Sequence, residues 1–96
     1  RLSKAEMHSI AERMLLSVAE RFKALGMTLT VPDAAVDYLA ERGYDERYGA
    51  RPLRRAIRSM IEDRAAELIL SGSLGRGDSV RALLDGDQLV LTKAEL

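Results

Sequence analysis

The sequence of 96 residues contains no cysteine and a single histidine, His8. The absence of thiols excludes disulfide bonds, thiolate zinc sites and cysteine nucleophiles. One imidazole excludes any site that needs two, so a Ser-His-Asp triad could only be built on His8. No apolar run approaches the roughly 18 residues that span a bilayer, and no signal-peptide pattern is seen, so we expect no membrane partner.

An excess of charge of either sign is also missing. Fifteen lysine and arginine residues balance fifteen aspartate and glutamate residues, and 47% of the residues are hydrophobic. Nucleic-acid and acidic-membrane binders usually carry a large positive excess, so the composition argues against both classes. The length and composition predict one globular domain over residues 1–96 with one modest core. Because the chain begins with Arg1, we expect a fragment of a longer protein that does not complete catalysis by itself.

A strong helical periodicity marks the first quarter of the chain. The spacing of apolar residues predicts an amphipathic helix from about Ser3 to Leu25. Ser3 with Glu6 fits a capping box at its start, and Gly26 suits the left-handed position just past its end. The predicted buried face consists of Met7, Ile10, Met14, Val18, Phe22 and Leu25.

The remaining pattern predicts an α+β fold of three helices and a small three-stranded sheet, in the order α-β-α-α-β-β. The expected elements are a strand at 28–31, helices at 32–42 and 52–70, and strands at 79–84 and 88–92 around the turn Asp85-Gly86-Asp87. Pro32 suits the first position of its helix, and Gly43 is expected to end it. The expected buried residues of these two helices are Ala35, Val36, Leu39, Leu53, Ala56, Ile57, Met60, Ile61, Ala65, Leu68 and Ile69.

The start of the 52–70 helix breaks a local rule. A helix N-terminus carries about half a positive charge from its unpaired N–H groups, so acidic side chains are favoured there. This one instead carries Arg51, Arg54, Arg55 and Arg58. Each exposed, unpaired cation in the first turn costs about 0.3–1 kcal/mol. An anion at that end would stabilise both the dipole and the guanidinium groups, whose planar fork binds phosphate or carboxylate.

Arg51 is the candidate binding residue of this cluster. It precedes Pro52 and is therefore expected at about the N-cap, where a side chain projects beyond the helix. Gly49 and Ala50 before it are small, which would let another surface approach the backbone closely.

A purely structural interpretation of the arginines stays open beside this one. Asp45 and Glu46 could neutralise them locally, and Arg54 and Arg58 could pair with Glu62 on a solvated helix face.

The other polar residues give weaker signals. His8 is expected to be a surface or boundary residue rather than a base. Tyr44 and Tyr48 are expected to pack the loop against the helices rather than to stack on a base. An exposed helix face accounts for Glu62, Asp63 and Glu67. We therefore expect no catalytic residue and no metal-binding residue in this chain.

Several stretches match the pattern of one known family. They are Leu-Thr-Val-Pro-Asp-Ala at 29–34, Gly43-Tyr44-Asp45, Tyr48-Gly49-Ala50-Arg51-Pro52-Leu53-Arg54-Arg55-Ala56-Ile57, Ile61-Glu62-Asp63 and Leu68-Ile69-Leu70-Ser71-Gly72, followed by the final hairpin. In these residues the chain resembles the C-terminal small subdomain of the second AAA+ module of Clp-type ATP-dependent unfoldases (the ClpA, ClpB and ClpC group). The resemblance covers nearly the whole chain, and its Gly-Ala-Arg-Pro-Leu block is specific.

The resemblance implies a role for the candidate residues. In that family the arginine of Gly-Ala-Arg is the sensor-2 residue, which corresponds to Arg51, with Gly49 and Ala50 beside it. Arg51 would then reach the phosphates of ATP or ADP bound in the large AAA+ subdomain and stabilise charge on the transferring phosphoryl group. We expect Mg²⁺ to be held outside this fragment.

The resemblance also implies partners. The subdomain would pack against the large subdomains of the same and the adjacent subunit and help to close a homo-hexamer in the cytoplasm. Hydrolysis would turn it as a rigid body and drive a substrate polypeptide through the pore. The sequence leaves open whether a protease ring is a further partner.

One departure from the family lies at Arg64, where many members carry a proline; we expect a less kinked helix there. The Walker motifs, the pore loop and the arginine finger are absent from the chain, so we expect no ATP hydrolysis by this fragment alone. Two other functions stay open: a small RNA- or DNA-binding module that uses the arginine-rich helix, and a structural adaptor for an acidic partner.

Overall fold

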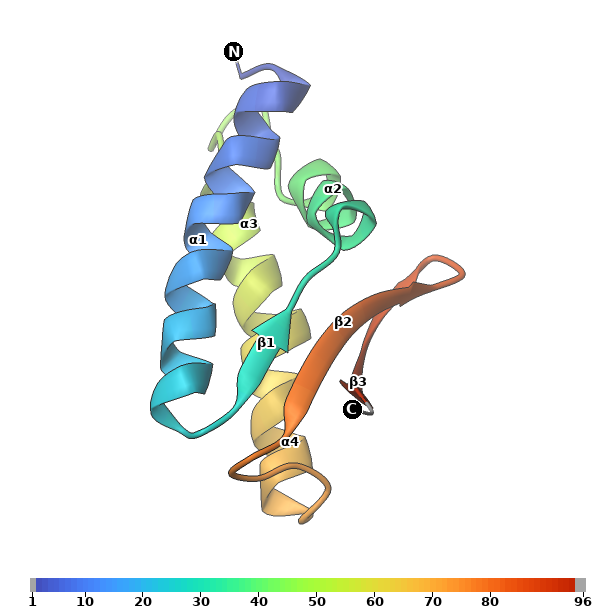
Figure 1. The fold of residues 1–96 in the computed structure, drawn as a ribbon. Coiled ribbons are helices and arrows are strands. Elements are labelled where there is room, and N and C mark those ends of the chain that lie inside the picture. The colour runs from blue at the N-terminus through green and yellow to red at the C-terminus, as the bar shows by residue number, and fades with distance from the viewer. Residues whose placement is uncertain (1, 95–96) are drawn as a thin grey trace.

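The computed structural model describes residues 2–94 and contains a helical layer beside a small sheet (Figure 1). The elements are α1 (Lys4–Ala24), β1 (Thr28–Thr30), α2 (Asp33–Arg42), α3 (Arg51–Ile57), the π-helical stretch η1 (Arg58–Asp63), α4 (Arg64–Leu70), β2 (Ser79–Asp85) and β3 (Gln88–Ala94). The predicted α+β class and element order are confirmed. Among residues 2–94, no helix has both the length and the apolar composition needed to cross a bilayer.

The predicted capping box begins α1. The Oγ atom of Ser3 accepts a hydrogen bond from the N–H of Glu6 at 3.1 Å, and the N–H of Ser3 donates to the Glu6 carboxylate at 2.8 Å. The backbone N–H of Ser3, followed by its hydroxyl, holds the pKa of Glu6 below its usual value. At the other end Gly26 adopts the predicted left-handed conformation, with φ of 82°.

The buried face of α1 is rotated from the predicted one. Its buried residues are Met7, Ala11, Leu15, Val18 and Phe22. The prediction missed Ala11, which lies at the centre of the observed face, and Leu15, which lies at its edge. Ile10 and Met14 are only partly buried, and Leu25 is 55% exposed, so the prediction for Leu25 was wrong. The face is wide because α1 packs against α2, α3 and β1.

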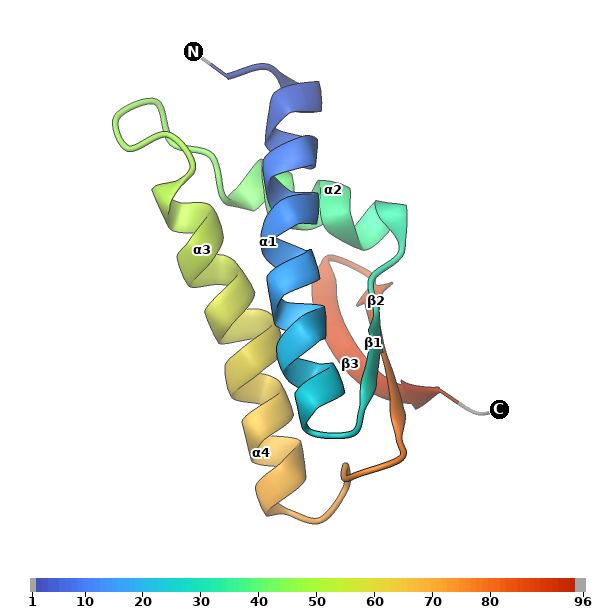
Figure 2. The same ribbon diagram turned by 60° about the vertical axis from the view of Figure 1, so that its left-hand side comes forward.

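The segments α3, η1 and α4 continue one another and form the rod (residues 51–70), which runs alongside α1 in Figure 2. The single helix predicted over 52–70 is therefore confirmed, with π-helical winding in its middle. Arg64 has helical φ and ψ of −66° and −40°, so the rod continues through this position. The residues that the rod buries are Leu53, Ile57, Ile61 and Ala65, whereas Ile69 is 37% exposed, against the prediction.

The sheet joins the strand that follows α1 to the C-terminal hairpin, in the order β1-β2-β3. Strand β1 pairs in parallel with β2, and β2 pairs antiparallel with β3. Asp85 pairs with Gln88, so Gly86 and Asp87 form the predicted hairpin turn, with φ of 66° at Gly86. Val31 lies outside β1, and β2 and β3 are slightly longer than predicted.

Gly43 ends α2 where the helix approaches the rod. It is the C-cap residue, as predicted, whereas Pro32 is the N-cap rather than the first helical residue. A Cβ atom at position 43 would lie 2.5 Å from the Cα atom of Leu53, closer than carbon atoms pack. The neighbouring rod therefore requires a glycine at position 43, whereas its φ of −93° is one that other residues also adopt.

Truncation of Leu53 tests whether this contact lies in the core. The side chain of Leu53 is fully buried, so we expect Leu53→Ala to lower the free energy of unfolding by about 2–5 kcal/mol, as measured by urea denaturation. Leu70→Ala is the matched control, because Leu70 is 88% exposed on the same rod, and its effect should stay within about 0.5 kcal/mol. Equal losses in the two variants would contradict the assignment.

Candidate functional site

The loop between α2 and the rod is a closed turn. Asp45 and Gly49 exchange two backbone hydrogen bonds, with N···O distances of 3.0 and 2.7 Å. The Oδ1 atom of Asp45 accepts hydrogen bonds from the N–H groups of Arg47 and Tyr48 at 2.7 and 3.1 Å. Gly49 has a φ of 63°, which favours glycine. The loop thus sets the direction in which the chain enters the rod.

Arg51 is the first residue of the rod rather than its N-cap. Ala50 is the N-cap, so the helix begins one residue earlier than predicted. Its side chain is exposed, and its guanidinium carbon lies over the Tyr48 ring, 5.6 Å from the ring centroid. Within residues 2–94, no carboxylate forms an ion pair with Arg51. The guanidinium is therefore stacked on an aromatic face while its N–H donors have no carboxylate acceptor in this part of the chain.

The backbone amides at the start of the rod are already hydrogen-bonded. The N–H of Arg51 donates to the carbonyl of Tyr48 at 3.2 Å, and that of Leu53 donates to the carbonyl of Ala50 at 3.0 Å. Pro52 has no N–H to offer. The expected attraction for an anion therefore depends on the arginine side chains rather than on unpaired amides.

Gly49 and Ala50 leave space beside Arg51. No atom lies within 4 Å of the position that a Cβ would take at Gly49, and both residues are half-buried. A second surface could therefore approach the backbone here, as their small size predicts.

The arginine face of the rod comprises Arg51, Arg54, Arg55 and Arg58, all of them exposed. At about 100° per residue these four positions span roughly 100° of the helix surface. The expected pairing of Arg54 and Arg58 with Glu62 is wrong, because the Glu62 carboxylate accepts a hydrogen bond from Nε of Arg21 at 3.0 Å. Glu62 is 31% exposed at the side chain and faces α1, which brings Arg21 within its range.

A groove of about 300 Å³ runs between α1 and the rod beside this face. Its charged lining consists of Arg13, Arg21, Arg54, Arg58 and Glu62. Four arginines against one glutamate give the groove a positive charge. The arginine face thus continues from the end of the rod into a groove shared with α1.

The expected neutralisation by Asp45 is also not seen. Its carboxylate accepts backbone hydrogen bonds instead of pairing with an arginine. Tyr44 packs against the core as predicted. The prediction for Tyr48 was wrong, because this side chain is 54% exposed and lies under Arg51. The carboxylates further along the rod form a solvated face, as expected, with Glu67 paired to Arg64 at 3.2 Å.

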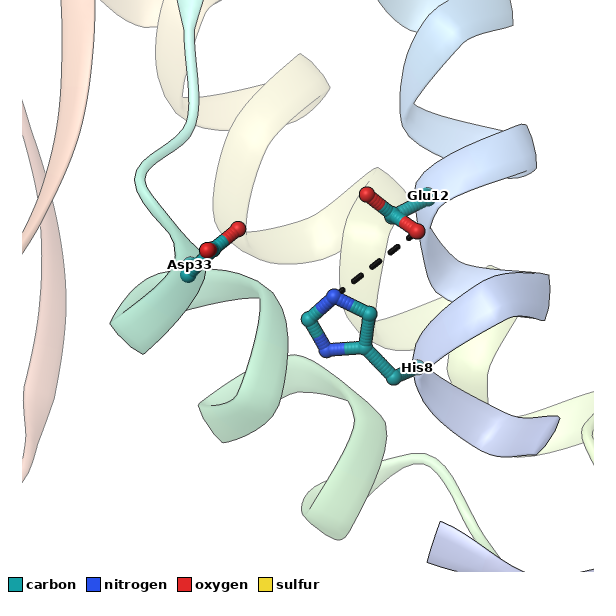
Figure 3. A group of neighbouring side chains, drawn as sticks. All are labelled: His8, Glu12 and Asp33. Atoms are coloured by element: carbon teal, nitrogen blue, oxygen red, sulfur yellow. Dashed lines mark ion pairs between the residues drawn. The ribbon is translucent and has the colours of Figure 1, made fainter. Parts of the chain in front are cut away.

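His8 is a half-buried boundary residue, as predicted, but its contact with α2 was not predicted. The Nδ1 atom is 2.6 Å from Oδ1 of Asp37, and Nε2 is 3.7 Å from Oε1 of Glu12 (Figure 3). The hydrogen bond to Asp37 raises the pKa of His8. Partial burial opposes this, and the charges of Asp37, Glu12 and Asp33 add to the rise. Sequence reasoning could not find this group because it lies across two helices.

The loop geometry can be tested at Asp45. Asp45→Ala removes the acceptor of two exposed backbone N–H groups, so we expect the free energy of unfolding to fall by about 0.5–1.5 kcal/mol. Amide hydrogen exchange at Arg47 and Tyr48 should become faster. Asp45→Asn keeps a side-chain oxygen acceptor and should retain most of the protection. Unchanged exchange in Asp45→Ala would show that this carboxylate does not hold the loop.

The similarity of this chain to known proteins extends over both the loop before Arg51 and the rod. Residues 2–82 match the family model described as the C-terminal, D2-small domain, of ClpB protein. The chain is 44% identical over 95 residues to the chaperone protein ClpB of Corynebacterium efficiens, which covers 98% of this chain and 11% of that protein. It is 40% identical over 96 residues to the chaperone protein ClpD, chloroplastic, of Arabidopsis thaliana, covering 98% of this chain and 10% of the relative.

A third relative is the ATP-dependent Clp protease ATP-binding subunit ClpA homolog of Cyanidium caldarium, 44% identical over 87 residues, with 91% of this chain and 10% of the relative covered. The chain therefore spans about a tenth of the length of these relatives. Since one of them is named as chloroplastic, the expected cytoplasmic location stays a prediction.

Proposed function

The chain belongs to the family of C-terminal D2-small domains of Clp chaperones, and from this membership we propose that it is the nucleotide-sensing, ring-forming subdomain of an ATP-driven protein unfoldase. It contributes to ATP hydrolysis without being an enzyme on its own. One relative is named as an ATP-binding subunit of an ATP-dependent protease, which agrees with a partner that holds ATP.

The state of Arg51 carries the proposal. It is an exposed guanidinium at the end of the rod, stacked on Tyr48 and without a carboxylate partner in residues 2–94. Arginine stays charged and offers two parallel N–H donors, the geometry that phosphate oxygens accept. In this role Arg51 binds the phosphates of ATP or ADP held by the large AAA+ subdomain, while Gly49 and Ala50 admit that surface. The residues that hold Mg²⁺ lie outside this chain.

The rod gives this contact a mechanical consequence. Twenty helical residues span about 30 Å, and the rod packs along α1 and contacts β3. A displacement at Arg51 therefore moves the whole subdomain as a rigid body against the large subdomains of its own and the adjacent subunit in a homo-hexamer. Such rotation is the step that pulls on a substrate polypeptide.

Arg51→Ala in the full-length protein tests the sensor role. Loss of one preorganised cation at the phosphates should lower ATP turnover by roughly 100-fold, measured as kcat with saturating ATP. Arg51→Lys keeps the positive charge but loses the planar guanidinium fork. Its ATP turnover should therefore lie between that of Arg51→Ala and that of the unaltered protein. Arg64→Ala, a matched exposed arginine further along the rod, should leave turnover near that of the unaltered protein. Full turnover in Arg51→Ala, with the domain folded by circular dichroism, would remove the role.

The positive groove favours one competing function, the binding of a nucleic acid along α1 and the rod. Binding of this kind weakens steeply with salt and strengthens with the length of the strand. We expect no length-dependent binding of single-stranded oligonucleotides at physiological salt, measured by fluorescence anisotropy, because the net charge of the chain is zero. Salt-sensitive binding that is lost in Arg54→Ala and Arg58→Ala would favour the nucleic-acid function instead.

A further inference from the structure

Four ionisable side chains meet where α1 crosses α2, on residues that are not part of the arginine face. His8 and Glu12 are four residues apart on α1, and Asp33 and Asp37 are four residues apart on α2, so each pair lies on one face of its helix. One donor atom from each of His8, Glu12 and Asp33 lies within 4.8 Å of the other two. Figure 3 shows these three side chains converging from the two helices. We propose that they form a binding site for a divalent transition metal ion of the Zn²⁺ class.

Asp37 prepares His8 for this role. Its carboxylate oxygen lies 2.6 Å from Nδ1, so the neutral tautomer that this carboxylate favours has its hydrogen on Nδ1 and its lone pair on Nε2. Nε2 is the atom on the side of Glu12, at 3.7 Å from Oε1. A carboxylate that orients the ring in this way is the usual outer partner of a metal-binding histidine. Asp37 is therefore a positioning residue, and His8, Glu12 and Asp33 are the ligands.

The donor set selects the kind of ion. One imidazole and two carboxylates suit Zn²⁺ and its neighbours among the transition metals. Ca²⁺ prefers six to eight oxygen ligands and Mg²⁺ a near-ideal octahedron, which three residues with a nitrogen donor do not provide. Neighbouring ligands on tetrahedral Zn²⁺ are about 3.4 Å apart, given bonds of about 2.1 Å. The exposed Glu12 and Asp33 side chains can close the remaining ångström by rotating.

The local charge also favours a cation. Three carboxylates, on Glu12, Asp33 and Asp37, surround one imidazole, so the group has a negative net charge even when His8 is protonated. Arg13 lines the same groove as Glu12 and Asp33, but within residues 2–94 it forms no ion pair with these carboxylates. A divalent ion would relieve the repulsion between Glu12 and Asp33 and tie α1 to α2.

The site has an access route and an open position. Glu12 and Asp33 line a groove of about 450 Å³ between α1, β1 and α2, whose apolar lining includes Leu16, Leu29 and Val31. Ions and water can therefore reach the ligands from solvent, as a metal site requires. Three protein ligands leave a fourth tetrahedral position for water or a small ligand on the side of this groove.

Calorimetric titration of the 96-residue chain with ZnCl₂ tests the proposal. We expect one ion per chain and a rise in Tm of about 5–10 °C at a free Zn²⁺ concentration ten times Kd, with no comparable rise in Mg²⁺. Glu12→Gln and Asp33→Asn should each weaken Zn²⁺ binding at least tenfold, and His8→Gln should abolish it. Asp37→Asn should weaken it by about 10–100-fold through the misplaced imidazole.

Glu20→Gln is the matched control, since it removes one exposed carboxylate from α1 outside the group. It should bind Zn²⁺ like the unaltered chain. Co²⁺ gives a second readout, because a tetrahedral site produces visible absorption bands that His8→Gln should lose. If His8→Gln does not fold in EDTA, the Zn²⁺ affinities of Glu12→Gln and Asp33→Asn, which change exposed side chains, test the proposal instead. Absence of Zn²⁺ binding, several weak ions per chain, or equal weakening in Glu20→Gln would each overturn the proposal.

Discussion

The close approach of Gly43 to Leu53 is the contact on which the geometry of the arginine face depends. A side chain at position 43 would displace α2 from the rod, because its Cβ would lie 2.5 Å from the Cα atom of Leu53. Leu53 is itself fully buried and comes two residues after Arg51. The loop between them therefore has both ends fixed to the core. The backbone of Arg51 is therefore held two residues from a fixed point of the core.

Within that frame the loop determines where the Arg51 side chain lies. The hydrogen bonds of Asp45 and the left-handed backbone of Gly49 return the chain on itself and bring Tyr48 beside Arg51. Stacking on the Tyr48 ring restricts the rotamers of Arg51 without consuming its N–H donors. A guanidinium ordered in this way loses less entropy when it binds an oxyanion, so Tyr48, which the sequence pattern assigned to packing, instead supports the proposed binding residue.

The features predicted from sequence are those that depend on residues near one another in the chain. The capping box at Ser3, the hairpin at Gly86 and the arginine face all have this character. The pairs that were missed join different helices: Arg21 and Glu62 are 41 residues apart, and His8 and Asp37 are 29 apart. Periodicity reports which face a residue occupies but not which helix lies opposite. For this reason the pairing of Glu62 with Arg54 and Arg58 was wrongly predicted, and the contact of His8 with Asp37 was not predicted.

The positive surface of the rod does not attract anions equally at its end and along the groove. The groove contains Glu62, whose charge offsets part of that of the arginines around it, whereas Arg51 forms no ion pair with a carboxylate among residues 2–94. A compact anion therefore gains most at Arg51, and a long polyanion laid along the groove gains progressively less. This difference supports the proposal that the surface binds a phosphate group rather than a nucleic-acid strand.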